Sequence, residues 1–171
     1  MVKVSDSSRS GDSERKTKQM INFIVGSEEF AMDLQHVQEV LSCPEITKLP
    51  RTPNYLQGVI DLRGEIIPII DMRIKLGLRR TERTPYTSII IVETNGKQVG
   101  AIVDKINQVL SLYEDQIIPP EKLAGGLSEK YVRGMGKLEE RLIVILDMSK
   151  ILTPEEVTEL KTIDNSLEEM Q

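Results

Sequence analysis

Short runs of apolar residues, several of them alternating with polar ones, recur along the chain, and turn-forming residues lie between them every 8 to 12 positions. In the first half these runs lie at residues 20–25, 30–32, 58–62 and 65–70. Gly26 opens a tight turn after the first run, and Arg63-Gly64 joins the last two. No amphipathic segment of about twelve residues separates the runs, so the pattern predicts antiparallel β-barrels rather than βαβ units.

The segment at residues 55–76 recurs without a gap at residues 131–152, with eight of 22 positions identical. The matched residues are types that a fold needs, such as a turn glycine, alternating aliphatics and a helix-capping aspartate. Residues 87–93 likewise repeat the first strand, and Asn95-Gly96 is a strong two-residue hairpin signal. The sequence therefore predicts a mainly β fold, with two packed five-stranded barrels built from an internal repeat, short helices and a C-terminal helix.

The repeat also sets the expected domain boundaries. Residues 1–18 are rich in Ser and charge and predict a disordered tail. Two barrel subdomains are expected at about 19–82 and 83–152, intimately packed and with strand exchange between them as one arrangement, because a core of about 70 residues is marginal alone. Residues 153–171 begin with the capping box Thr153-Pro154-Glu155-Glu156 and predict a helix.

Short helical turns are expected where caps precede mixed spacing. Asp33 caps residues 34–41, in which apolar residues recur at helical or mixed intervals, and Thr52-Pro53 predicts a short helix that holds Tyr55. The repeated aspartates are also expected to be structural N-caps, at Asp71 and Asp147.

Composition narrows the possible functions. A net charge of −5 and only two Phe, four Tyr and no Trp argue against a nucleic-acid binder. Cys43 is the single cysteine, which excludes an intramolecular disulfide. The first residues lack the apolar region of a signal peptide, and no apolar run reaches the length of a spanning helix. We therefore expect a cytoplasmic protein with no direct membrane insertion.

Catalytic and metal-binding signatures are missing from the sequence. It contains no phosphate-binding loop, no nucleophile elbow and no zinc-protease motif. His36 is the only histidine, so a His-based metal cluster is impossible and a catalytic dyad would depend on it alone. We predict no enzymatic activity, no cofactor and no metal site.

The hairpin tips are where the two repeats differ most. Residues 61–65 read DLRGE, whereas residues 137–141 read KLEER. In one interpretation, Gly64 supplies a positive φ and Arg63 is only its solvated neighbour. In the other, Arg63 is a recognition residue whose planar fork meets a partner carboxylate.

Two apolar pairs at equal spacing, Val37/Val40 and Ile106/Val109, also leave two interpretations open. They are either ordinary core or the wall of a groove that accepts a partner helix through i, i+3 and i+4 anchors.

Several spaced motifs, which together run from about residue 19 to 152, resemble the CheW family of bacterial chemotaxis coupling proteins. They are FAMDLQHVQEV at 30–40, TPNYLQG at 52–58, LRGEIIPIIDMR at 62–73, VGAIVDKINQVL at 99–110 and DMSKIL at 147–152. The resemblance implies paired Src-homology-3-like barrels without enzymatic activity. It further implies a scaffold that couples transmembrane chemoreceptors to the histidine kinase CheA, recruited to membrane receptor arrays.

The resemblance also implies the contact surfaces. The cytoplasmic tip of the receptors would meet a groove made of Val37, Glu39, Gly58, Arg63, Thr87, Ile89, Gly100 and Val109. The regulatory domain of CheA, which has the same fold, would bind the ends of both barrels. The family usually has Asn before the L-R-G motif, and Asp61 here is expected to pair locally with Arg63.

A barrel that binds single-stranded nucleic acid or a small ligand is the alternative function from another class. The acidity of the chain and its shortage of aromatic residues disfavour this alternative.

Overall fold

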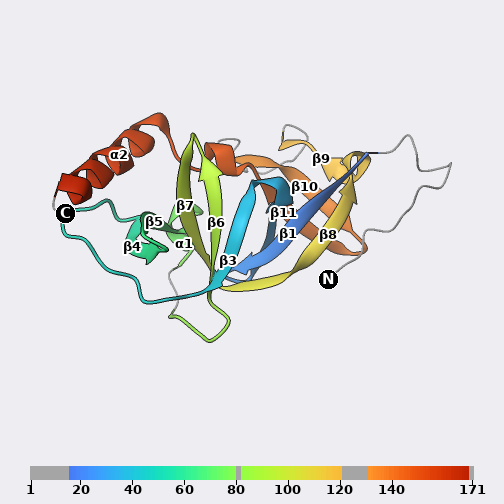
Figure 1. Cartoon of the computed structure of the whole chain (residues 1–171). Coiled ribbons are helices and arrows are strands. Elements are labelled where there is room, and N and C mark those ends of the chain that lie inside the picture. The colour runs from blue at the N-terminus through green and yellow to red at the C-terminus, as the bar shows by residue number, and fades with distance from the viewer. Residues whose placement is uncertain (1–15, 80–81, 121–130, 170–171) are drawn as a thin grey trace.

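The computed structural model describes residues 16–79, 82–120 and 131–169, and within these ranges the strands form two sheets (Figure 1). The first repeat contributes β1 (Thr17–Val25), β2 (Glu28–Asp33), β3 (Val37–Ser42), β4 (Leu56–Leu62) and β5 (Glu65–Asp71). The second contributes β6 (Ser88–Thr94), β7 (Lys97–Val103), β8 (Lys105–Tyr113), β9 (Ile117–Ile118), β10 (Val132–Leu138) and β11 (Arg141–Leu146). The helices are α1 (Met72–Lys75) and α2 (Pro154–Glu169), and 3-10 turns lie at Leu34–His36, Glu114–Gln116 and Met148–Lys150.

The repeats exchange their first hairpins. Sheet A has the order β8-β1-β2-β11-β10-β9, and sheet B has the order β3-β6-β7-β5-β4. Thus β1–β2 of the first repeat lies among strands of the second, and β6–β7 of the second lies among strands of the first. A short parallel pairing closes each exchange, with Ala31 opposite Ile145 in sheet A and Gly100 opposite Ile69 in sheet B. The fold is mainly β, as predicted, and both sheets draw strands from both repeats.

The C-terminal boundary of the tail predicted at residues 1–18 lies too far along the chain, because β1 begins at Thr17 and pairs there with Tyr113 of β8. Residues 1–15 lie outside the described residues. Where the chain divides into subdomains stays a prediction.

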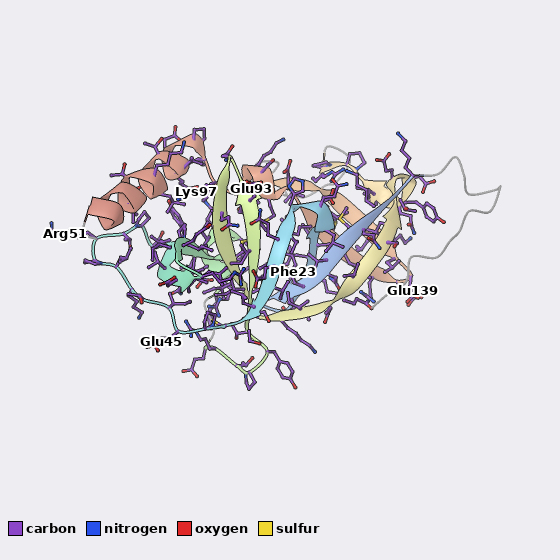
Figure 2. The ribbon with its side chains drawn as sticks, viewed as in Figure 1. Phe23, Glu45, Arg51, Glu93, Lys97 and Glu139 are labelled. Carbon is purple, nitrogen blue, oxygen red and sulfur yellow. The ribbon has the colours of Figure 1, made fainter. Side chains whose placement is uncertain are left out.

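One large apolar core lies between the two sheets. Phe23, with no exposed surface, is near the middle of the molecule, and its ring stacks on Phe30 at 6.1 Å between centroids (Figure 2). Ile90 and Val103 of sheet B belong to the same core. Smaller cores lie within sheet A, around Ile145, and within sheet B, around Ile69. The shared core therefore joins the two sheets by burial of apolar side chains.

The helical turn predicted at residues 34–41 is wrong beyond its first three residues. Leu34–His36 form a 3-10 turn, and the Oδ1 atom of Asp33 caps it by accepting a hydrogen bond from the N–H of Gln35 at 3.0 Å. From Val37 onward the chain is strand β3.

A β-bulge explains the misleading spacing. The cross-strand pairs are Val37–Val92 and Val40–Ile90 on β3, and Ile106–Phe23 and Val109–Ile21 on β8. Val37 and Val40 face the same side of sheet B because a bulge after Val37 inserts one extra residue between them. The bulge in the pairing of β8 with β1 produces the same three-residue interval. An interval of three is normally a sign of a helix, and here it marks a bulged strand.

The other predicted caps have mixed outcomes. No helix follows Thr52: Leu56 begins β4 and its N–H donates to the Pro53 carbonyl at 3.1 Å, so a turn replaces the helix. The Oδ1 atoms of Asp71 and Asp147 accept from main-chain N–H groups two residues later, at 2.9 and 3.0 Å, and both caps are confirmed.

The C-terminal helix α2 begins with the predicted capping box. The Thr153 N–H donates to Glu156 Oε1 at 2.9 Å, and the Glu156 N–H donates to Thr153 Oγ1 at 3.1 Å. Leu160 is 1% exposed within the inter-sheet core, and Lys75 Nζ lies 2.6 Å from Glu156 Oε1. The helix is therefore packed on the sheets rather than extended from them (Figure 1).

Candidate functional site

The eight residues of the predicted receptor groove lie in three different environments. Four are buried in or beside sheet B: Gly58, Thr87, Ile89 and Gly100. Three are half-buried on edge strands: Val37, Glu39 and Val109. Arg63 is exposed at the tip of the β4–β5 hairpin. The set is therefore not a single continuous surface.

Gly58 permits a close approach of two backbone segments. It has a φ of +148°, and a Cβ at this position would lie 2.2 Å from the Thr47 carbonyl oxygen. Gly134 repeats the arrangement in the second half, with a φ of +154° and a Cβ position 2.5 Å from the Ile118 carbonyl oxygen. Since both repeats need this glycine, its role is structural.

Gly100 and Ile89 shape the interior of sheet B. A Cβ on Gly100 would lie 2.5 Å from Ile69 Cδ1 and 2.9 Å from Ile89 Cγ2. Thr87, which is 2% exposed, closes the loop before β6 by accepting a hydrogen bond from the Thr84 N–H at 2.9 Å. Gly100, Ile89 and Thr87 are therefore buried in or beside sheet B and do not themselves form an exposed surface.

The edge strands β3 and β8 carry equivalent apolar residues. We call Val37, Val40, Ile106 and Val109 the β3–β8 rim. Val37 and Ile106 pack against the inter-sheet core, and Val40 is 42% exposed. The rim thus borders the shared core from one strand of each sheet, which agrees with the core interpretation for Val37 and Ile106. The interpretation as a groove for a partner helix stays a prediction.

Arg63 and Glu39 form an ion pair between the β4–β5 hairpin and β3. Arg63 Nη2 lies 2.5 Å from Glu39 Oε1, and Nη1 lies 3.3 Å from Oε2. The side chains are 70% and 31% exposed, respectively. The hydrogen bonds from Arg63 lower the pKa of Glu39, and the pKa of Arg63 is raised by the same contact. The pair presents a bidentate arginine at the surface next to β3.

The expected local pairing of Asp61 with Arg63 is wrong. The Oδ1 atom of Asp61 accepts a hydrogen bond from the Gly64 N–H at 2.9 Å and so closes the hairpin turn. Arg63 and Gly64 have φ values of 53° and 89°. Two consecutive left-handed residues are typical of a tight hairpin turn, and Glu139 adopts the same conformation, at 57°, in the second repeat. Arg63 is left to pair with Glu39.

Two exposed apolar residues were not singled out from the sequence. Tyr86 is 64% exposed, with Lys105 Nζ 5.2 Å from its ring centroid, and Leu142 is 54% exposed on β11. Leu142 occupies the repeat position of Ile66, so the alignment of the two copies marks it as a strand residue without indicating its exposure.

Among the described residues, no three His, Cys, Asp or Glu side chains converge to a potential metal site. The described helices include none that is both long and apolar enough to cross a membrane.

The features of the fold and the site, two sheets with exchanged hairpins and an apolar rim beside an exposed arginine, fit a scaffold protein. The chain belongs to the CheW-like domain family, whose model matches residues 19–156. This family consists of non-enzymatic scaffolds. The chain is a chemotaxis scaffold of the kind that couples chemoreceptors to CheA.

Individual relatives agree with this assignment. The chain is 34% identical over 149 residues to chemotaxis protein CheW of Klebsiella aerogenes, covering 87% of this chain and 90% of the relative. It is 34% identical over 135 residues to chemotaxis protein CheW of Helicobacter pylori, covering 78% and 81%. The crystal structure of scaffolding protein TtCheW from Thermoanaerobacter tengcongensis superposes with a TM-score of 0.74 and 32% identity, covering 80% of this chain and 93% of that one.

Proposed function

We propose that the β3–β8 rim and the Arg63–Glu39 pair form the surface that meets the cytoplasmic tip of a chemoreceptor. The exposure of Val40 carries the proposal. Val40 lies at the border of the inter-sheet core with 42% of its surface exposed, so an apolar surface stays open to a partner. A helical hairpin from a receptor offers apolar residues at i, i+3 and i+4, which match a short apolar edge.

In this proposal the buried members of the predicted groove act indirectly. Gly58, Thr87, Ile89 and Gly100 hold sheet B in shape, and Arg63 supplies the directional contact. A receptor carboxylate would compete with Glu39 for the guanidinium, which makes the ion pair a determinant of specificity.

We further propose that CheA binds through its regulatory domain at the ends of both sheets and that the scaffold works in the cytoplasm beneath membrane receptor arrays. These two statements rest on membership of the family.

Separate capture experiments with a receptor cytoplasmic hairpin and with the C-terminal domain of CheA test the proposal. Val40→Asp should abolish capture by the receptor hairpin and preserve capture by the kinase domain. Leu142→Asp is the matched control, because it places the same charge on an exposed apolar residue of sheet A. If the wild-type chain binds neither partner, the proposed function is wrong.

A further inference from the structure

The corner that leads into β8 is built differently from the corner that leads into β3. In the first repeat β2 reaches β3 through the capped 3-10 turn Leu34–His36. In the second repeat β7 ends at Val103 and β8 begins at Lys105, so Asp104 alone makes the corner. The contacts of Asp104 therefore fix the point at which the chain passes from sheet B into β8, which then pairs with β1 from Lys105 onward.

Asp104 is held from both sheets. On the side of sheet A, its N–H donates to the Ile24 carbonyl at 2.9 Å, and its Oδ2 atom accepts from the Gly26 N–H at 2.6 Å. On the side of sheet B, its Oδ1 atom accepts from Arg73 Nη1 at 3.4 Å. The contact with Arg73, which follows β5, links this corner to the other sheet.

Arg73 is itself fixed in place. Its side chain is 3% exposed, its Nε lies 3.0 Å from Asp71 Oδ1 and its Nη2 lies 3.2 Å from Asp71 Oδ2. Gln57 Nε2 donates to the same carboxylate at 2.9 Å. A planar guanidinium can bind one carboxylate with two nitrogens and still reach a second acceptor with the third, which a lysine ammonium cannot reproduce.

The second repeat has no counterpart of this arginine. Ser149 stands at the position of Arg73, and its hydroxyl donates to Asp147 Oδ1 at 2.6 Å. A serine is too short to bridge to a neighbouring corner. The link from Arg73 is thus specific to the β7–β8 corner, which is the one without a 3-10 turn.

We propose that Arg73 is a positioning residue, which acts through Asp104 to fix β8 relative to sheet B. Ile106 and Val109 lie on β8, so Arg73 fixes where one side of the β3–β8 rim stands relative to the other. At 3% exposure Arg73 lies beyond the reach of a partner protein, so any effect of it on binding is indirect. The Asp104 variant isolates the part of that effect that passes through β8, because Asp104 does not contact Asp71 or Gln57 in the bonds described above. The inference rests on the proposed receptor surface for its functional consequence, whereas its structural part can be measured alone.

Spin labels on the two edge strands measure that structural part. Ser42 on β3 and Ser111 on β8 are both exposed and occupy equivalent positions in the repeats. Cys43 is replaced by Ser, both positions are changed to Cys and labelled, and double electron–electron resonance gives the distance distribution.

Asp104→Asn is the main variant, because it keeps an oxygen for the Gly26 N–H and turns an amide toward Arg73. Arg73→Lys is the second variant, and Lys75→Gln, which breaks the ion pair with α2, is the control.

We expect both Arg73→Lys and Asp104→Asn to shift or broaden the distance distribution and to weaken binding of the receptor hairpin by about tenfold. Lys75→Gln should leave the distribution unchanged, and circular dichroism confirms that each variant is folded. Distributions of both variants that superpose on the wild type would overturn the inference. A changed distribution with unchanged receptor affinity would instead refute the rim as the receptor surface, so the two failures are distinguishable.

Discussion

Tyr55 and Tyr131 occupy the same place in the two repeats, and their main-chain carbonyls accept the same hydrogen bond. The Asp71 N–H donates to the Tyr55 carbonyl, and the Asp147 N–H donates to the Tyr131 carbonyl, both at 2.8 Å. The two hydroxyls have different partners. The Tyr131 hydroxyl donates to the Lys75 carbonyl, in the other repeat, at 2.7 Å. The backbone of the unit is thus duplicated, whereas this side-chain contact joins the copies.

The exchange of hairpins predicts that the two repeats unfold together. Neither sheet can form from one repeat alone, since each takes a hairpin from the other. We expect a single calorimetric transition, and we expect fragments cut near Arg83 to remain unfolded when expressed separately. Mixing the fragments should restore the fold. Two well-separated transitions in the intact chain would contradict this expectation.

Gly58→Ala should destabilise the protein. The added methyl group would approach the Thr47 carbonyl oxygen at 2.2 Å, in a backbone conformation that L residues rarely adopt. We expect the free energy of unfolding, measured by urea titration, to fall by more than the roughly 1 to 3 kcal/mol of backbone strain alone, because the contact with Thr47 adds to that strain. A weaker receptor interaction in this variant would follow from the distorted sheet and not from a lost contact.

Gly64→Ala is the control for Gly58→Ala. Gly64 also has a positive φ, but a Cβ there would meet nothing within 4 Å. Gly64→Ala should lower the free energy of unfolding by only about 1 to 2 kcal/mol, which is the strain of a left-handed backbone. Equal losses for the two variants would show that the close approach to Thr47 is unimportant.

Arg63→Glu should weaken receptor binding and leave the protein folded. The substitution places a second carboxylate opposite Glu39, and Glu139 already adopts the same left-handed conformation in the second repeat. We expect receptor-hairpin affinity to fall by about tenfold or more, because a reversed charge opposes the partner carboxylate. Isothermal titration calorimetry measures the affinity, and the melting temperature reports on the fold.

Two further variants separate the roles of Arg63. Glu139→Arg reverses the charge at the equivalent hairpin tip of sheet A and should matter less for receptor binding. Combining Arg63→Glu with Glu39→Arg restores an ion pair in the opposite sense. If the combination recovers receptor binding, the pair acts only to hold the hairpin against β3, and Arg63 does not contact the receptor.

Local sequence features predicted the local structure well. The strands expected at 58–62 and 65–70 lie within β4 and β5, and Asn95-Gly96 forms the β6–β7 turn with two positive φ values. These features depend on residues that are adjacent in the chain. The bulge in β3 produces a three-residue interval, which is also the interval of a helix, so the sequence pattern predicts a helical turn where the structure has a strand.

Contacts between distant segments could not be predicted in the same way. Two repeats with the same pattern of strands give a strand no local signal for which copy it should pair with, so the sequence leaves the hairpin exchange as one possible arrangement. The family motif placed Gly58 and Arg63 in one set, but burial separates them into a structural residue and an exposed one. The partner of Arg63 lies 24 positions away and depends on the register of β3 and the hairpin.

Leu160→Ala should show that α2 is part of the shared core. Leu160 is 1% exposed, so truncation leaves a cavity between the helix and the sheets. We expect the free energy of unfolding to fall by about 3 kcal/mol in urea titration. Lys161→Ala, on the exposed side of the same helix, should have little effect. Equal stability of Leu160→Ala and the wild type would mean that α2 only rests on the surface.

The carboxyl group of Asp71 should make the free energy of unfolding fall at acidic pH. Burial alone would raise the pKa of Asp71, but hydrogen bonds from Arg73 and Gln57 outweigh burial and hold that pKa below its ordinary value. A carboxyl group whose pKa is lowered on folding stabilises the folded state above its unfolded pKa of about 4, and this contribution is lost as the pH falls through the folded value.

Asp71→Asn should therefore lower the free energy of unfolding by about 3 to 5 kcal/mol at pH 7, because it leaves Arg73 buried without its main partner. The difference in unfolding free energy between wild type and Asp71→Asn, followed by urea titration from pH 7 downward, should stay constant to about pH 4 and then shrink. A difference that stays constant down to pH 2, or one that grows, would show that the carboxylate of Asp71 does not hold Arg73.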